Sequence, residues 1–227
     1  MSRQPGAVLW DMDGTLVDTE PYWMAAETAL VESYGGSWTH DDALQLVGNG
    51  LIDSAIILQN AGVDMAAEAI ISRLTDAVQE ALRTQGVPFR PGARELLHDL
   101  RATGIRTGLV TMSLRRMALG VVDLIDFEAF DIVVAGDDVK NSKPHPEPYL
   151  QAAALLGVDI SDTVVIEDSP TGLRAGIASG AVALGVPHIV SLDGVGAHEL
   201  WPTLAERGAS DIADLFTRLT SLTGATR

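Results

Sequence analysis

The chain of 227 residues contains no cysteine. A disulfide framework, a cysteine nucleophile and a cysteine-ligated zinc site are therefore excluded. Basic residues are also scarce, because 15 Lys and Arg stand against 31 Asp and Glu and give a formal net charge of −16. Such a surface repels phosphate backbones, so we expect no nucleic-acid partner. If the substrate is an anion, some group must neutralise the site that binds it.

Long apolar runs are absent as well. No window approaches the roughly 18 apolar residues of a membrane span. The start of the chain, residues 1–6, lacks the basic stretch and apolar run of a signal peptide. We therefore expect a cytoplasmic protein with no membrane partner. Hydrophobic residues make up 47% and charged residues 20%, which is typical of a globular chain and excludes wholesale disorder.

Short apolar runs rich in Val and Ile alternate with helical patterns after residue 90. Runs of this length are typical of buried strands in a parallel sheet. The predicted strands are 7–10, 105–110, 132–134, 163–166 and 181–186. Helical patterns occur at 92–103, at 147–156 and from Ser169 onward. This alternation predicts an α/β fold with a doubly wound parallel sheet.

The segment between the first strand and residue 90 has a different character. It shows helical patterns at 22–34, 51–61 and 66–83 and no convincing strand. It returns through residues 86–92, a stretch rich in Pro and Gly that suits a domain boundary. We therefore predict one domain from residues 1–16 and 90–227, and an inserted helical domain from residues 17–89.

Polar side chains follow the predicted strands at the point where each strand ends. Ligands of open α/β sheets bind at this edge. The side chains gathered there would be Asp11, Asp13, Thr111, Met112, Ser113, Lys143, Glu167 and Asp168. Each also has an ordinary explanation on its own: Asp-Gly is common in turns, and a strand-end hydroxyl, a surface lysine and an acid at a helix start need no function.

In this order the motifs resemble those of the haloacid dehalogenase-like hydrolase superfamily. Motif one, DxDGT, stands at residues 11–15, and motif two is a hydrophobic strand that ends at Thr111. Motif three is Lys143 followed by proline, and motif four is the acidic pair at residues 167–168. The resemblance covers nearly the whole chain. It implies a Rossmann-like α/β core and, from the insert between motifs one and two, an α-helical cap.

The resemblance also implies chemistry, namely a phosphatase that acts on a small phosphorylated metabolite. Asp11 would be the nucleophile that forms an aspartyl-phosphate, which divides a difficult hydrolysis into two easier steps. Asp13 would protonate the leaving alcohol and then deprotonate water. A general acid must start protonated, and a crowd of carboxylates can favour the protonated form of one of its members.

The resemblance implies Mg²⁺ as the cofactor. Asp11, Asp168 and the main-chain carbonyl of Asp13 would be ligands, with Glu167 either binding the ion, directly or through water, or orienting its ligands. Four ionised acids and Lys143 sum to about −3, and Mg²⁺ with a protonated Asp13 would bring the site to zero. We therefore expect no activity without a divalent cation.

The phosphoryl group would be bound from the other side of the site. The resemblance assigns Thr111 and Lys143 to its oxygens, with Met112 and Ser113 in the same loop. It also places a specificity loop of the cap at residues 46–51, where Asn49 would contact the leaving group, although a loop Asn with positive φ is an equal explanation.

Several further expectations concern specificity and assembly. Arg115 and Arg116 would either meet an anionic substrate or form a solvated helix face. A β-phosphoglucomutase-like phosphomutase is an alternative, but Trp23 stands near the position of that branch's histidine, and the loop at 48–51 lacks its arginine. A non-catalytic phosphate-binding regulator is a second alternative. Residues 15–90 contain no lysine, which excludes Schiff-base chemistry in the insert. We expect a monomer or a weak homodimer.

Overall fold

A computed structural model gives the fold and describes residues 3–47 and 50–224. Within these ranges a six-stranded sheet has the order β3-β2-β1-β4-β5-β6, and every neighbouring pair is parallel. The strands are β1 (Ala7–Trp10), β2 (Arg106–Val110), β3 (Ile132–Val134), β4 (Thr163–Glu167), β5 (Val182–Gly185) and β6 (Glu199–Leu200). The five predicted strands are confirmed. Strand β6 was missed because two residues without an apolar run give no recognisable pattern.

The sheet is covered on both faces, as a parallel sheet requires. Alternate residues of β1 point to opposite sides: Val8 and Trp10 enter one apolar cluster, and Ala7 and Leu9 enter another. The helices that follow the strands are α5 (Ala93–Ala102), α6 (Arg115–Val122), α7 (Glu147–Leu156), α8 (Pro170–Ser179) and α9 (Ala209–Gly224). Helices α5, α6 and α9 pack on the face of Trp10, and α7 and α8 pack mainly on the face of Leu9.

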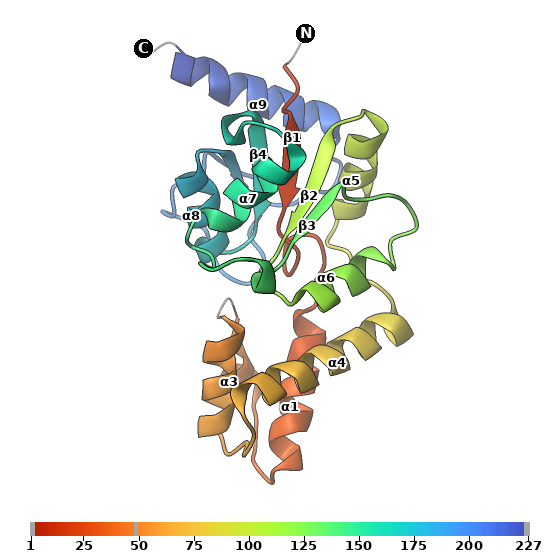
Figure 1. Ribbon diagram of the computed structural model, residues 1–227, viewed down its shortest axis with the longest axis vertical. Coiled ribbons are helices and arrows are strands. Elements are labelled where there is room, and N and C mark those ends of the chain that lie inside the picture. Colours follow the sequence, from red (N-terminus) through yellow and green to blue (C-terminus); the bar gives the residue numbers. More distant parts are fainter. Residues whose placement is uncertain (1–2, 48–49, 225–227) are drawn as a thin grey trace.

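The inserted segment forms a helical lobe beyond the carboxyl edge of the sheet (Figure 1). Its helices are α1 (Glu20–Ser33), α2 (His40–Leu44), α3 (Leu51–Asn60) and α4 (Ala67–Gln85). The three predicted helices are confirmed. Helix α2 was missed because it has only five residues, although a capping box of Thr39 and Asp42 marks its start. The lobe has its own apolar core, while Val78 and Leu82 of α4 join the cluster of the sheet.

The chain enters and leaves the lobe through a narrow neck of two segments. Val17 and Phe89 form an antiparallel bridge. The Asp18 N–H donates to Pro88 O at 2.7 Å, and the Arg90 N–H donates to Leu16 O at 2.9 Å. The predicted boundaries, 16/17 and 89/90, fall on this neck, and the division into two domains stays a prediction.

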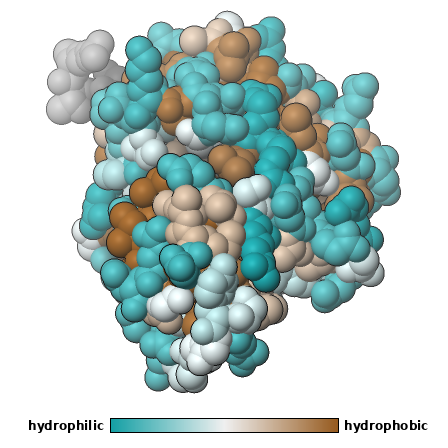
Figure 2. All heavy atoms as spheres, turned by 60° about the horizontal axis from the view of Figure 1, so that its bottom comes forward, coloured by the Kyte–Doolittle hydropathy of each residue, from teal (hydrophilic) through white to brown (hydrophobic). Residues whose placement is uncertain are grey.

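Figure 2 shows the face of the molecule on which the lobe comes forward. In Figure 2 most of the forward face is hydrophilic, and hydrophobic residues lie in separate patches. Within the described ranges, no helix combines the length and apolar character that a membrane-crossing segment requires. The expected location in the cytoplasm and the expected monomer or weak homodimer stay predictions.

Candidate active site

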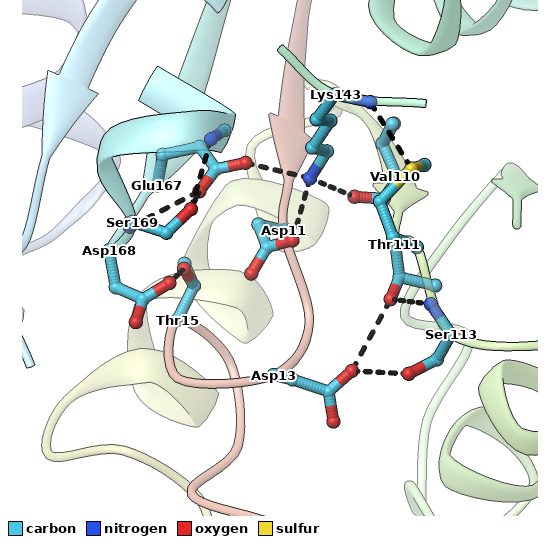
Figure 3. A network of polar contacts seen from close by, with 12 residues as sticks. Asp11, Asp13, Thr15, Val110, Thr111, Ser113, Lys143, Glu167, Asp168 and Ser169 are labelled. Atoms are coloured by element: carbon cyan, nitrogen blue, oxygen red, sulfur yellow. Dashed lines mark hydrogen bonds and ion pairs between the residues drawn. The ribbon is translucent and has the colours of Figure 1, made fainter. Parts of the chain in front are cut away.

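The predicted residues meet at the carboxyl edge of the sheet, in the loops after β1, β2 and β4 and in the loop that precedes α7 (Figure 3). Lys143 is at the centre of one group. Its Nζ donates to Asp11 Oδ1 at 2.7 Å, to Glu167 Oε1 at 2.7 Å and to Val110 O at 2.9 Å. The side chain of Lys143 is only 4% exposed. An ammonium group has three donors, so all three have a partner here.

The charges of this group are strongly coupled. Burial, followed by repulsion from Glu167, raises the pKa of Asp11 to about 7, although Lys143 acts in the opposite direction. Burial opposes the charged form of Lys143, but Asp11 and Glu167 outweigh it and raise its pKa. Burial, with repulsion from Asp11 and Glu167, also raises the pKa of Asp168 well above its usual range. The single lysine therefore does not balance the acids around it.

Glu167 is fully buried and well bonded. Besides Lys143, it accepts a hydrogen bond from the Tyr149 hydroxyl at 2.6 Å and from Ser169 Oγ at 3.2 Å. A Cβ at Gly172 would overlap the Glu167 carboxylate, so this glycine makes room for it. Sequence reasoning missed Tyr149, which lies on α7 shortly after motif three, because an aromatic residue on a helix is normally interpreted as part of the core.

Asp168 lies on the other side of Asp11. The Thr15 hydroxyl donates to Asp168 Oδ1 at 3.1 Å. Gly14 has φ +89°, and a Cβ there would overlap the Asp168 carboxylate. Motif one therefore needs glycine both for its left-handed backbone and for the close approach of Asp168. The sequence analysis also did not predict Thr15 as a hydrogen-bond partner of Asp168, although Thr15 belongs to motif one.

Asp13 points away from Lys143 toward a set of hydroxyl groups (Figure 3). Thr19 Oγ1 donates to Asp13 Oδ1 at 2.5 Å, and Ser113 Oγ donates to Asp13 Oδ2 at 2.7 Å. Thr111 Oγ1 lies 3.4 Å from Oδ2 and accepts the Ser113 N–H at 3.0 Å. Thr19 stands at the start of α1 but does not cap it with its side chain. Its hydroxyl instead connects the lobe's first helix to Asp13.

Other predicted residues lie less directly in the site. Met112 is half-buried, and its sulfur accepts the Lys143 N–H at 3.4 Å, so its side chain supports the lysine loop. The main chain of Met112 would have to make the predicted phosphate contact, which stays a prediction. Asn49 lies outside the described residues, and its predicted role also stays a prediction.

The two arginines after motif two are both engaged with protein groups. Arg115 forms hydrogen bonds with Asp138 at 2.7 to 3.1 Å and donates to Val133 O. Arg116 reaches the lobe, where its Nη1 donates to Asp76 at 2.5 Å and to Gln79 at 2.9 Å. Both side chains are nevertheless partly exposed, at 42% and 38%, so the two expectations, a solvated helix face or contact with an anionic substrate, stay predictions.

The acids of the site fit a hard divalent cation. One carboxylate oxygen from each of Asp11, Glu167 and Asp168 lies within 4.8 Å of the others. Only oxygen ligands converge here, and burial, followed by repulsion among the acids, raises the pKa values of Asp11 and Asp168. Oxygen ligands in this number suit Mg²⁺, which keeps several waters.

Known proteins are similar to this chain in sequence and in fold. The model of the haloacid dehalogenase-like hydrolase family matches residues 8–186. The phosphorylated carbohydrates phosphatase of Thermotoga maritima is 35% identical over 185 residues, which cover 80% of this chain and 85% of that protein. Hexitol phosphatase B of Escherichia coli is 32% identical over 193 residues, 82% of this chain and 85% of its own length.

Solved structures agree. CbbY from Rhodobacter sphaeroides, in complex with phosphate, has a TM-score of 0.80 and 27% identity and covers 92% of this chain and 99% of its own. The β-phosphoglucomutase of Clostridium difficile has a TM-score of 0.81 at 21% identity, with 96% and 99% covered, which is a likeness of fold. The predicted fold and enzyme class are confirmed, and the chain belongs to the haloacid dehalogenase-like hydrolases, a family in which its relatives include phosphatases.

Proposed function

We propose that the protein is a Mg²⁺-dependent phosphomonoesterase that hydrolyses small phosphorylated metabolites through an aspartyl-phosphate at Asp11. The observation that carries the proposal is the buried contact of Asp11 with Lys143 beside Glu167 and Asp168. Sugar or polyol phosphates are the substrates we favour, since two relatives are named as phosphatases of phosphorylated carbohydrates and of hexitols.

Asp11 attacks the phosphorus atom. Lys143 holds Asp11 Oδ1, which orients Oδ2 toward the substrate. As the new P–O bond forms, the bond from phosphorus to the leaving oxygen breaks, and Asp13 gives its proton to that oxygen. Water then attacks the same phosphorus, Asp13 takes a proton from it, and the bond to Asp11 breaks. Inorganic phosphate leaves, and both carboxyl groups return to their starting states.

Lys143 also stabilises the transferred group. Its three donors are engaged with Asp11, Glu167 and the neutral carbonyl of Val110. A phosphoryl oxygen beside Asp11 can replace the Val110 carbonyl and receive a stronger, charge-assisted hydrogen bond. The hydroxyls of Thr111 and Ser113 lie next to Asp13. From there they donate hydrogen bonds to the phosphoryl oxygens as negative charge develops on them.

Mg²⁺ would be held by Asp11, Asp168 and the Asp13 carbonyl. The carboxylate oxygens of Glu167 already accept hydrogen bonds from Lys143, Tyr149 and Ser169. Glu167 therefore acts on the ion through water or by orienting the other ligands. When bound, the ion supplies positive charge that lets a phosphate dianion approach the acids and stabilises charge in the transition state.

A substrate screen with and without Mg²⁺ tests the proposal. Purified protein is assayed for phosphate release from p-nitrophenyl phosphate and a panel of sugar, polyol and acid phosphates. We expect turnover that chelation lowers at least about 100-fold and that added Mg²⁺ restores. Asp11→Asn should lower it at least about 1,000-fold, and the matched control Asp64→Asn, an exposed aspartate of the lobe, should not.

Three results contradict the proposal. Turnover that persists after thorough chelation excludes the role of the metal, and full activity in Asp11→Asn excludes the nucleophile. Interconversion of sugar-phosphate isomers with a bisphosphate activator, measured in a coupled assay, identifies a phosphomutase instead. Phosphate binding without turnover of any ester identifies a regulator.

A further inference from the structure

Helix α6 begins shortly after motif two, and its second residue, Arg116, contacts the lobe. Arg116 Nη1 donates to Asp76 Oδ1 at 2.5 Å and to Gln79 Oε1 at 2.9 Å. Nη2 donates to Ser72 O at 3.0 Å, and Gln79 Nε2 donates in return to Arg116 O at 2.8 Å. The three partners lie on one face of α4, since they are spaced as i, i+4 and i+7. One guanidinium group therefore spans about two turns of this helix.

Close packing surrounds this contact. Leu114, the residue before α6, packs against the lobe's apolar core, and Val78 of α4 packs in the cluster of the sheet. A Cβ at Gly120 would lie 3.0 Å from Gln79 Nε2, so glycine allows the two helices to approach each other. Apolar packing is non-directional, whereas hydrogen bonds need a defined geometry. The polar contacts of Arg116 therefore select one orientation of α4 on α6.

The lobe is attached to the sheet domain at two places. One is the neck, where Val17 and Phe89 form a bridge and Thr19 Oγ1 donates to Asp13 Oδ1. The other is the contact between α4 and α6, which lie next to each other in Figure 1. A body held by one narrow neck can turn about it, and a second attachment removes that freedom. The contact of Arg116 therefore determines how the lobe is oriented.

This second attachment begins where the loop after β2 ends. Ser113, whose hydroxyl donates to Asp13, lies three residues before Arg116. Between them, Arg115 is held on the sheet domain by Asp138 at 2.7 Å. The start of α6 thus connects the proposed acid and base, the sheet domain and the lobe. Loss of the Arg116 contact would move the lobe while the groups on the sheet keep their places.

We propose that Arg116 is a positioning residue that fixes the orientation of the lobe over Asp13, so that the lobe meets the leaving group of the substrate at a defined place. The effect on turnover rests on the proposed phosphatase function, whereas the effect on orientation does not. Arginine suits this task because its rigid, planar fork reaches several partners at once. The side chains of Arg116 and Asp76 are 38% and 66% exposed, so salt should screen the ion pair and weaken the attachment.

A first experiment measures turnover. Wild type, Arg116→Met and Arg116→Lys are assayed in Mg²⁺ with p-nitrophenyl phosphate and with the most active sugar or polyol phosphate of the panel. Arg83→Met is the matched control, because Arg83 pairs with Glu80 on the same helix of the lobe. Arg116→Met should lower kcat/KM for the sugar or polyol phosphate about tenfold, mainly through KM, and that for p-nitrophenyl phosphate less than about twofold. Arg116→Lys should lie between, and Arg83→Met should change neither.

Two further comparisons isolate the ion pair. Asp76→Asn should reproduce part of the loss, and adding it to Arg116→Met should cause little further loss, because both changes remove the same contact. Raising NaCl from about 0.1 M to about 1 M should move the wild-type ratio of the two kcat/KM values toward that of Arg116→Met. A residue that only stabilises the fold would not make this ratio depend on salt.

A second experiment measures the orientation directly and needs no turnover. The chain has no cysteine, so Asn60→Cys in the lobe and Arg174→Cys in the sheet domain, both at exposed positions, attach a pair of spin labels. Pulsed electron paramagnetic resonance then gives the distribution of distances between them. We expect a narrow distribution in this parent and with Arg83→Met, and a broader or shifted one with Arg116→Met.

The outcomes separate this inference from the proposed function. If wild type turns over no ester, the phosphatase proposal fails, and the distance distributions still decide the role of Arg116. Distributions that are the same with and without Arg116→Met overturn the inference, whatever the activity. Equal losses on both substrates, with a lower melting temperature, identify a merely structural role and also overturn it.

Discussion

The two sides of the proposed active site are built in different ways. On the sheet side, Lys143, Asp11 and Glu167 form a buried network in which the ammonium group has three partners. On the lobe side, Glu27 is also buried, beside the Trp38 indole, but none of the ion pairs among the described residues includes it. The sheet side fixes its hydrogen-bond donors before substrate binds, which suits a fixed reaction. The lobe side buries its acid without a compensating cation.

The largest expected effect tests the sheet side. Lys143→Met removes the cation that pairs with both Asp11 and Glu167 and leaves these buried acids without compensation. We expect loss of turnover and a destabilisation of about 3–5 kcal/mol, measured by urea unfolding of the metal-free protein. Lys140→Met is the control, because Lys140, the other lysine of the chain, is exposed and should change little. An unchanged unfolding midpoint for Lys143→Met would show that the network does not stabilise the fold.

The next expected effect is the pH dependence of stability, which differs between the sheet side and the lobe side when Mg²⁺ is added. The folded protein raises the pKa of Asp11, Glu20 and Glu27 to about 7 from 3.8, 4.5 and 4.5. Between about pH 4 and 7 the folded state therefore binds more protons than the unfolded state, so metal-free stability falls as pH rises through this window. Mg²⁺ binds ionised carboxylates, so its stabilisation should grow over the same range.

Thermal unfolding between pH 5 and pH 8, with and without Mg²⁺, measures both effects. Glu27→Gln should flatten the fall in metal-free stability while leaving the Mg²⁺-dependent gain, and Asp168→Asn should reduce that gain. A Mg²⁺ gain that is independent of pH, or that survives Asp168→Asn in full, would contradict the assignment of the ion to the sheet side.

The smallest expected effect concerns a single hydrogen bond. Tyr149→Phe removes the buried hydroxyl that donates to Glu167 at 2.6 Å and leaves its acceptor with one partner fewer. We expect a loss of about 1–3 kcal/mol in the free energy of unfolding. Tyr34→Phe, at an exposed tyrosine, should have almost no effect. If the two variants unfold alike, the Tyr149 contact contributes nothing to the sheet side.

Sequence reasoning reached the sheet side because its residues follow strand ends. Asp11, Thr111 and Glu167 each lie at or beside the carboxyl end of a parallel strand, and parallel order brings those ends together. It missed Tyr149, whose contact with Glu167 depends on how α7 packs against the sheet. A local pattern carries no such information.

The helices of the lobe could be predicted from the sequence, but which of their side chains are buried or bonded could not. An isolated Glu in an amphipathic helix normally reads as solvent-facing, so burial of Glu27 was not foreseen. Arg115 and Arg116 are adjacent in the sequence, yet one bonds to Asp138 of the sheet domain and the other to Asp76 of the lobe. Neighbouring residues on a helix face different directions, and only the placement of the lobe decides which partner each one meets.

The neck has an evolutionary consequence. The two strands of chain that connect the lobe are bonded to each other, through Asp18 to Pro88 and Arg90 to Leu16. Because entry and exit lie side by side, everything between them can lengthen, shorten or be replaced without moving the ends that the sheet must hold. The lobe is in this sense an exchangeable module, and new substrates can be acquired by recombination at two points of the chain while the reacting groups stay in place.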